Sequence, residues 1–214
     1  MEAKTAGALQ FWFDFASSYS YIAAMRIQPL CETAGVTLAW KPFLLGPIFA
    51  LQGWNDSHFN LNRRRGAYMW RDIERLATKY ELPFQRPSAF PRASTLAARI
   101  ACSIADEVWA GEFIRRVFVA NFGENLDIGD ADELARILTQ LGQPAQTTID
   151  LALGEHKERL RANTGHAIEI GIFGAPNCVA NGELFWGEEA LEDAIGWLKS
   201  HPDAAAPAAP RTNR

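Results

Sequence analysis

Phe-Trp-Phe-Asp-Phe-Ala-Ser-Ser-Tyr-Ser-Tyr, residues 11–21, joins an apolar run to a cluster of hydroxyl side chains. Residues 9–15 are apolar apart from Gln10 and Asp14, which is typical of a strand that helices cover on both faces. From residue 18 to 34 apolar side chains recur at helical spacing, which predicts a helix. Ser17 therefore lies where the strand turns into the helix. Its side-chain oxygen is placed to accept a hydrogen bond from the first helical turn, and the same junction can hold an anion.

A second strand follows this helix and completes a β-α-β unit. Pro29 is expected to kink the helix or to break it early, because proline removes a backbone hydrogen bond, and Gly35 is expected to end it. Residues 36–43 carry aromatic and β-branched side chains, which predict the strand. Residues 46–60 then have the composition of a loop.

The middle of the sequence has no strand pattern over about a hundred residues. Helical periodicity and capping residues predict helices at 63–80, 92–107, 109–122, 130–141 and 146–163. Strand signals return only at 177–180 and 183–186, which flank the hairpin signal Asn181-Gly182, and residues 188–199 then have the pattern of an amphipathic helix.

The order β-α-β, helices, β-β-α predicts an α/β protein with a thioredoxin-like fold that an all-helical insertion interrupts. The thioredoxin-like domain is expected at 9–45 and 164–200, and the insertion at 46–163. Residues 201–214 are rich in Ala and Pro, have little to bury, and are expected to form a flexible tail.

Composition argues for a small-molecule partner. The formal net charge of −4 over 214 residues is too balanced to predict binding to nucleic acid or to an anionic membrane. No apolar run is long enough to span a membrane, and the first ten residues do not resemble a secretory signal, so a cytoplasmic protein is expected. The three cysteines lie far apart, and the four histidines form no close pair, so no metal site is predicted.

The chain resembles the kappa-class glutathione transferases and the 2-hydroxychromene-2-carboxylate isomerases, within the DsbA-like branch of thioredoxin folds. The resemblance covers about residues 9–200 and rests on four places: 13–21, 41–46, 64–68, and 174–176 followed by 184–187. It implies glutathione as the cofactor, a small aromatic substrate and a homodimer.

The resemblance places the glutathione sulfur near Ser17, the predicted catalytic residue. Disulfide-exchanging relatives carry C-x-x-C at this turn, whereas this chain has Ser17 and Ser20, which cannot form a disulfide. Lowering a thiol pKa by two units takes about 2.7 kcal/mol. A helix N-terminus supplies about 0.3–1 kcal/mol, and a charge-assisted hydrogen bond about 1.5–3 kcal/mol. We therefore predict that the Ser17 hydroxyl donates to the sulfur. The simpler alternative is that Ser17 only caps the helix.

Further glutathione contacts follow from the same resemblance. Ala175-Pro176 resembles the cis-proline loop of thioredoxin folds, which would direct the Ala175 backbone toward the cysteinyl backbone of glutathione. Arg65 corresponds to a basic residue that meets the glycine carboxylate, and Asn55 to a polar position in the preceding loop. The neighbouring Arg63 and Arg64 are expected to be solvated surface charges.

The sequence departs from the family pattern at two places. After Trp186-Gly187 the family continues with a polar residue, Asp, Arg and Leu, whereas this chain has Glu188-Glu189-Ala190-Leu191. Glu188 and Glu189 are kept as glutathione-binding residues, with Glu189 replacing the Asp that meets the α-amino group, but the missing arginine puts the strength of binding in question. Ser18 also replaces a usual proline.

Three functions fit these features. The first is a glutathione-dependent isomerase of 2-hydroxychromene-2-carboxylate or a similar intermediate of aromatic compound degradation. The second is a kappa-like glutathione transferase or peroxidase. The third is a non-catalytic binding module, because the fold alone does not imply an activity. For the first two, the substrate pocket is expected between the Ser17 turn and the insertion, lined by Trp54, Phe59, Tyr68 and Trp70.

Overall fold

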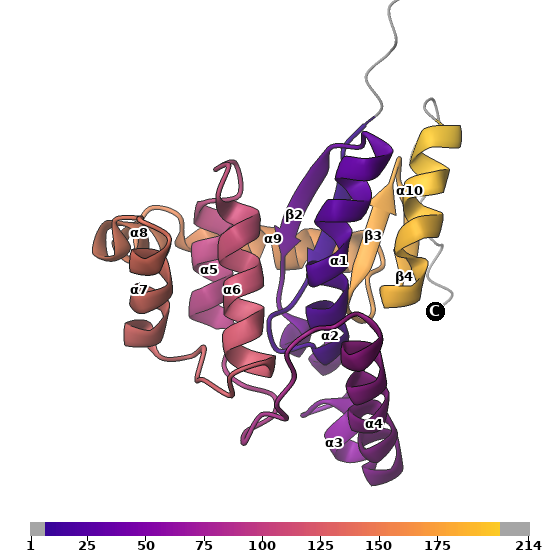
Figure 1. The fold of residues 1–214 in the computed structure, drawn as a ribbon, viewed down its shortest axis with the longest axis horizontal. Coiled ribbons are helices and arrows are strands. Elements are labelled where there is room, and N and C mark those ends of the chain that lie inside the picture. The colour runs from indigo at the N-terminus through magenta and orange to yellow at the C-terminus, as the bar shows by residue number, and fades with distance from the viewer. Residues whose placement is uncertain (1–6, 202–214) are drawn as a thin grey trace, which may run out of the picture.

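A four-stranded mixed sheet forms the centre of the computed structural model, which describes residues 7–201 (Figure 1). The strands β1 (Leu9–Phe13), β2 (Leu38–Pro42), β3 (Asn177–Ala180) and β4 (Glu183–Trp186) lie in the order β2-β1-β3-β4. β1 and β2 are parallel, whereas β1 with β3 and β3 with β4 are antiparallel. This is the predicted thioredoxin-like arrangement. Residues 202–214 of the predicted tail lie outside the described residues.

Helices make up the rest of the fold. They are α1 (Ser18–Ala34), α2 (Leu45–Leu51), α3 (His58–Leu61), α4 (Arg63–Lys79), α5 (Thr95–Ser103), α6 (Ala110–Phe122), α7 (Ala131–Gln140), α8 (Ala145–Leu153), α9 (Lys157–Glu169), the 3₁₀ turn η1 (Glu188–Ala190) and α10 (Leu191–Ser200). Every element between β2 and β3 is helical, as the sequence predicts. The division into two domains stays a proposal, and α9 runs across its boundary at residue 163. No helix within 7–201 is long and apolar enough to cross a membrane.

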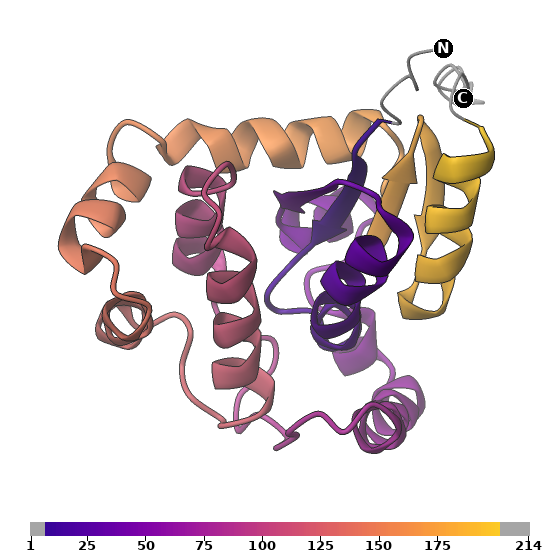
Figure 2. The same cartoon turned by 45° about the horizontal axis from the view of Figure 1, so that its top comes forward.

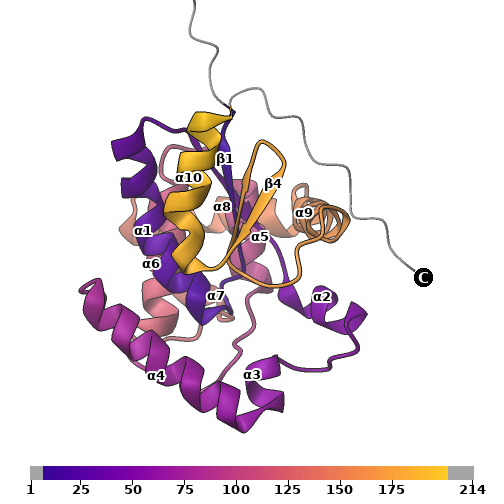
Figure 3. The ribbon, with the colours of Figure 1, turned by 90° about the vertical axis from the view of Figure 1, so that its right-hand side faces the viewer.

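The two faces of the sheet have separate apolar cores, because successive side chains of a strand point to opposite faces. Leu9, Phe11 and Phe13 belong to the larger core, together with α1, α6 and α10. Trp12 faces the other way and packs with Ala167 of α9. Figure 3 shows α1 and α10 on one side of the sheet and α9 on the other. Both faces of β1 are therefore covered, and each buried large side chain contributes about 1.5–3 kcal/mol.

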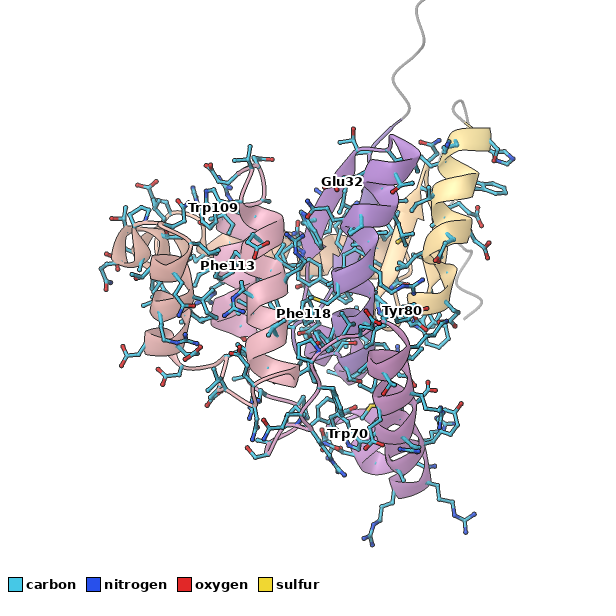
Figure 4. All side chains as sticks on the ribbon, viewed as in Figure 1. Glu32, Trp70, Tyr80, Trp109, Phe113 and Phe118 are labelled. Atoms are coloured by element: carbon cyan, nitrogen blue, oxygen red, sulfur yellow. The ribbon has the colours of Figure 1, made fainter. Side chains whose placement is uncertain are left out.

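The helical segment is attached to the sheet by aromatic contacts. Phe118 of α6 lies 5.8 Å from Phe13 and 4.9 Å from Phe15, measured between ring centroids. Figure 4 shows Phe118 between α6 and α1. Helix α9 runs from α8 back to the strands along the top edge of the molecule in Figure 2. The chain therefore returns to β3 after packing α6 onto the end of β1.

Helix α1 corrects one prediction and confirms another. Pro29 lies inside a helix that continues to Ala34, so the prediction of an early break is wrong. Ile27 and Cys31 on either side of Pro29 are buried, and their packing offsets the lost backbone hydrogen bond. Gly35 ends the helix in the left-handed region, with φ 67°, as expected of a residue at this position.

The bounds of several other elements also differ from the predictions. The expected loop at 46–60 contains α2 and α3, and Pro47 is tolerated in α2 because it lies in the first turn. The expected single helix at 146–163 is divided at Gly154, whose φ of −97° and ψ of −104° are not helical. The last helix begins with the 3₁₀ turn η1 before α10.

Candidate functional site

A cleft of about 1060 Å³ opens between the Ser17 turn, the segment 174–176, η1 and helices α2 to α4. It gathers side chains from places far apart in the sequence, because β1 and β3 are neighbours in the sheet. All but one of the predicted site residues line it: Ser17, Trp54, Asn55, Phe59, Arg65, Tyr68, Ala175, Pro176, Glu188 and Glu189.

The Ser17 hydroxyl makes two hydrogen bonds. It accepts from the backbone N–H of Ser20 at 3.2 Å, which makes Ser17 the N-cap of α1, and it donates to the carbonyl oxygen of Ala175 at 3.2 Å. The side chain is 8% exposed. The hydroxyls of Ser18 and Ser20 are buried without a hydrogen-bond partner in the described part of the chain. Ser17 is thus the hydroxyl of this turn that reaches the segment across the cleft.

The Ala175–Pro176 peptide bond is cis, which confirms the prediction. The Pro176 carbonyl accepts from the Gly187 N–H at 3.1 Å, and this bond ties the loop to the start of η1. The Ala175 N–H donates to no other residue within 7–201. A second cis bond, Phe90–Pro91, was not predicted and also lies at the cleft. The Ala175 backbone therefore offers a free donor beside the Ser17 hydroxyl.

Asp14 is a cleft residue that was not among the predicted site residues. Its carboxylate accepts from the Ala16 N–H at 2.9 Å, from the Leu45 N–H at 2.8 Å and from the Ser94 hydroxyl at 2.8 Å. Burial raises the pKa of Asp14, against the opposing effect of these hydrogen bonds. The side chain joins the Ser17 turn to the starts of α2 and α5. Its position as the one polar residue of the apolar run 11–15 was the signal that could have identified it.

The two glutamates that depart from the family pattern have different surroundings. Glu188 is buried, and its carboxylate pairs with the Arg26 guanidinium at 2.6 Å. Glu189 is exposed and lines the cleft without an ion pair in the described range. Gly187, with φ 108°, leaves the room that the Glu189 carboxylate occupies, because a Cβ there would lie 2.5 Å from its Oε2. Of the two, Glu189 has the carboxylate available to a ligand.

Arg65 is the one of three consecutive arginines that lies at the cleft. It lines the cleft, whereas Arg63 and Arg64 do not. It is exposed and has no ion pair with any residue that the structure describes. The Asn62 side chain accepts from the Arg64 and Arg65 N–H groups and begins α4 at this point. The register of the helix thus directs one of three consecutive arginines to the cleft.

A second pair of cleft residues was also missed. The Tyr19 hydroxyl donates to Asp72 Oδ2 at 3.0 Å, and Arg75 pairs with the other oxygen at 2.7 Å. Burial raises the pKa of Tyr19, and the Asp72 carboxylate raises it further. The pair connects α1 to α4 within the lining of the cleft. Nothing in the spacing of these residues, 53 positions apart, predicted the contact.

One wall of the cleft is aromatic. Measured between ring centroids, Trp54 lies 5.6 Å from Phe49 and 5.5 Å from His58, and His58 lies 3.9 Å from Phe59. Tyr68 is 63% exposed and lies at the rim. Of this wall, Trp54 and Phe59 were predicted from the sequence, whereas Phe49 and His58 were not.

Trp70 is the predicted pocket residue that the structure places elsewhere. It is 7% exposed and packs at 4.8 Å on Phe90, with the Arg86 guanidinium 4.9 Å from its ring. Figure 4 shows it beside α4. Trp70 and Tyr68 are two positions apart on a helix and so lie on different faces. Trp70 therefore supports Phe90 from behind and does not line the cleft.

None of the three cysteines lies in the cleft. Cys31, Cys102 and Cys178 are all buried and free. Burial raises the pKa of Cys31 to about 11 and that of Cys102 to about 12. These thiols are therefore protonated at neutral pH. Any sulfur nucleophile in the cleft has to come from a ligand. Among residues 7–201, no three His, Cys, Asp or Glu side chains gather as a metal site would require.

Comparison with known proteins relates the chain to one family. Residues 8–196 match the model of a DSBA-like thioredoxin domain. Over 196 residues the chain is 26% identical to 2-hydroxychromene-2-carboxylate isomerase of Sphingobium xenophagum, with 89% of this chain and 97% of that protein covered. It is 23% identical over 178 residues to glutathione S-transferase kappa 1 of Caenorhabditis elegans, with 78% of each covered. A solved structure of 2-hydroxychromene-2-carboxylate isomerase matches with a TM-score of 0.81 at 25% identity, over 91% of this chain and 97% of that one.

Proposed function

The chain belongs to the DSBA-like thioredoxin domain family, and from this premise we propose that it is a glutathione-dependent isomerase of 2-hydroxychromene-2-carboxylate or a similar cyclic hemiketal. The observation that carries the proposal is the Ser17 hydroxyl, which lies in the cleft within hydrogen-bond distance of Ala175 beside the cis proline. The chain's own thiols are buried elsewhere, so the reacting sulfur would be that of glutathione. Relatives named as isomerases and as a kappa transferase support a glutathione-related reaction.

Glutathione would bind with its cysteinyl backbone along the Ala175 segment. The Ala175 N–H is free to donate to the ligand, as an added strand requires. A ligand amide that donates to the Ala175 carbonyl would replace the Ser17 hydroxyl there. The Ser17 hydrogen could then turn to the sulfur, where a charge-assisted bond is worth about 1.5–3 kcal/mol. Binding of the ligand and activation of its thiol are linked in this way.

The two ends of glutathione carry charges that match the cleft. Arg65 would meet the glycine carboxylate, with Asn55 nearby on the same rim. Glu189 would meet the α-amino group of the γ-glutamyl arm. Glu188 would act indirectly, because its carboxylate is held by Arg26 and fixes the position of η1.

The reaction needs no other reagent. The thiolate adds to one carbon of the conjugated double bond, and the proton that the thiol gave up goes to the other carbon. The hemiketal ring then opens, and the former double bond rotates because addition has removed its double-bond character. Elimination then returns glutathione and releases trans-2-hydroxybenzylidenepyruvate, whose phenolic oxygen is the former ring oxygen. No atom is gained or lost. The aromatic wall of Phe49, Trp54 and Phe59 would hold the substrate ring.

A kappa-like transferase or peroxidase would use the same thiolate, and the similarity to glutathione S-transferase kappa 1 favours it as the second candidate. A non-catalytic binding module is the third. For either enzyme we also propose, from the family resemblance, a homodimer in the cytoplasm.

An activity assay tests the proposal. Isomerisation of 2-hydroxychromene-2-carboxylate is followed by absorbance with and without glutathione, beside conjugation of 1-chloro-2,4-dinitrobenzene. We expect isomerisation that requires glutathione. Conjugation without isomerisation would favour the transferase. Absence of heat on titration with millimolar glutathione, measured by calorimetry, would leave only the binding module.

A further inference from the structure

His58 is the histidine that lines the cleft. It is the first residue of α3, and the preceding residue, Ser57, is the N-cap of this helix. Its ring lies among aromatic side chains, with centroids 3.9 Å from Phe59, 5.5 Å from Trp54 and 5.9 Å from Phe49. An imidazole therefore stands within the wall that would hold an aromatic substrate.

The other three histidines have polar partners, and His58 has none among residues 7–201. His156 Nδ1 lies 2.5 Å from the Ser103 hydroxyl, and its Nε2 lies 3.1 Å from Arg159. His166 and His201 contact Glu169 and Ser200. In His58, Nδ1 is buried without a partner, and no residue in the described range bonds Nε2. Because Nδ1 has no exposed surface, Nε2 is the nitrogen through which His58 can meet a ligand in the cleft.

The charges around His58 favour its neutral form. Burial lowers the pKa of His58, and the positive charge of Arg65 on α4 lowers it further. The Asp56 carboxylate, two residues away, is occupied by the Ser57 N–H at 2.6 Å and by the Asn60 amide at 3.1 Å. A neutral imidazole has one nitrogen that accepts and one that donates. His58 can thus take a proton at neutral pH and give it back.

We propose that His58 is a catalytic acid–base residue of the cleft, exchanging a proton with the hydroxyl oxygen of an aromatic substrate. In the isomerisation, which rests on the proposed function, the imidazole takes the proton of the hemiketal hydroxyl. The O–H electron pair forms the carbonyl, and the ring C–O bond breaks with its electrons on the phenolic oxygen. The imidazolium then protonates that oxygen. Both oxygens start on the same carbon, so one nitrogen can serve both, and His58 ends unchanged.

The pH dependence of kcat tests the catalytic role. Wild type should lose kcat at low pH, as His58 becomes protonated, with a midpoint below the ordinary histidine value. His58→Gln keeps a hydrogen-bonding side chain but cannot exchange a proton, so kcat should fall about 10²-fold or more and the acidic limb should vanish. The KM for glutathione should change little. His156→Gln, outside the cleft, is the matched control and should keep the wild-type profile. A wild-type profile in His58→Gln would overturn the proposal.

A binding measurement separates this inference from the proposed function. The probes are trans-2-hydroxycinnamate and cinnamate, which differ by one hydroxyl and do not isomerise in the cleft. Wild type should bind the hydroxylated probe about five to ten times more tightly. His58→Phe, which keeps an aromatic ring, should bind both equally. Equal binding by wild type, binding of neither probe, or a preference that survives in His58→Phe would each overturn the proposal. The preference without isomerase activity would support the His58 contact and reject the isomerase.

Discussion

The Ser17 hydroxyl donates to the Ala175 carbonyl at 3.2 Å, although 158 positions separate the two residues in the chain. The antiparallel pairing of β1 with β3 brings them together. Ser17 is the predicted partner of the glutathione sulfur, and Ala175 is the predicted partner of its cysteinyl backbone. The fold itself therefore brings these two residues into contact.

Replacing Ser17 by Ala should raise the pKa of the bound glutathione thiol by about one to two units, because a charge-assisted hydrogen bond is lost. Loss of the N-cap should also lower the free energy of unfolding by about 1 kcal/mol. Thiolate absorbance against pH measures the first effect, and urea unfolding the second. Ser20→Ala is the control, since the Ser20 hydroxyl has no partner within 7–201 and its substitution should leave the thiol pKa unchanged.

Asp14→Asn should destabilise the protein by about 1–3 kcal/mol, because an amide cannot accept from all three donors that the carboxylate holds. Ser94→Ala removes only one of these donors and should cost less. Since burial raises the pKa of Asp14, the native state keeps the proton to a higher pH than the unfolded state. The stability of wild type relative to Asp14→Asn should therefore decrease as pH rises above about 4. Urea unfolding at several pH values checks the sign, and an increase would contradict it.

Glutathione should raise the pKa of His58. The Arg65 charge lowers this pKa in the free protein, and a glycine carboxylate bound to Arg65 would offset that charge. NMR titration of the His58 ring protons, with and without glutathione, measures the change. Arg65→Gln should raise the pKa of His58 in the free protein and remove its response to glutathione. Arg64→Gln should retain the response, because Arg64 lies outside the cleft lining.

Arg26→Ala should lower the free energy of unfolding by about 3 kcal/mol, because it leaves the buried Glu188 carboxylate without its counter-charge. The loss should shrink as the pH falls, because burial raises the pKa of Glu188 and the protonated carboxyl needs no counter-charge. Arg71→Ala breaks an exposed pair with Glu74 and should stay within about 0.5 kcal/mol of wild type. A similar cost in the two variants, measured by urea unfolding, would mean that Glu188 is solvated.

Much of the fold could be predicted because its signals are local. The hairpin between β3 and β4 follows from Asn181-Gly182, which have φ values of 50° and 84°. The break between α8 and α9 could not be predicted, because helical periodicity continues past Gly154. Continuity of α1 through Pro29 depends on packing that the sequence does not display.

The residues that line the cleft were predicted where the family resemblance covered them and missed where contacts are long-range. Tyr68 and Trp70 look alike in the sequence, but the rotation of α4 puts only Tyr68 at the cleft. His58 stands in a polar segment and has no sequence neighbour that indicates chemistry. Its environment depends on Phe49 and Trp54, which α2 and the following turn bring to it.

The burial of Cys31, Cys102 and Cys178 away from the cleft has a consequence for how such an enzyme would withstand oxidants. If the reacting sulfur belongs to glutathione, an oxidised or alkylated sulfur leaves by dissociation, and a fresh molecule replaces it. The polypeptide itself is then not covalently modified. Activity would then follow the supply of reduced glutathione in the surroundings, and peroxide would act on the pool before it acts on the protein.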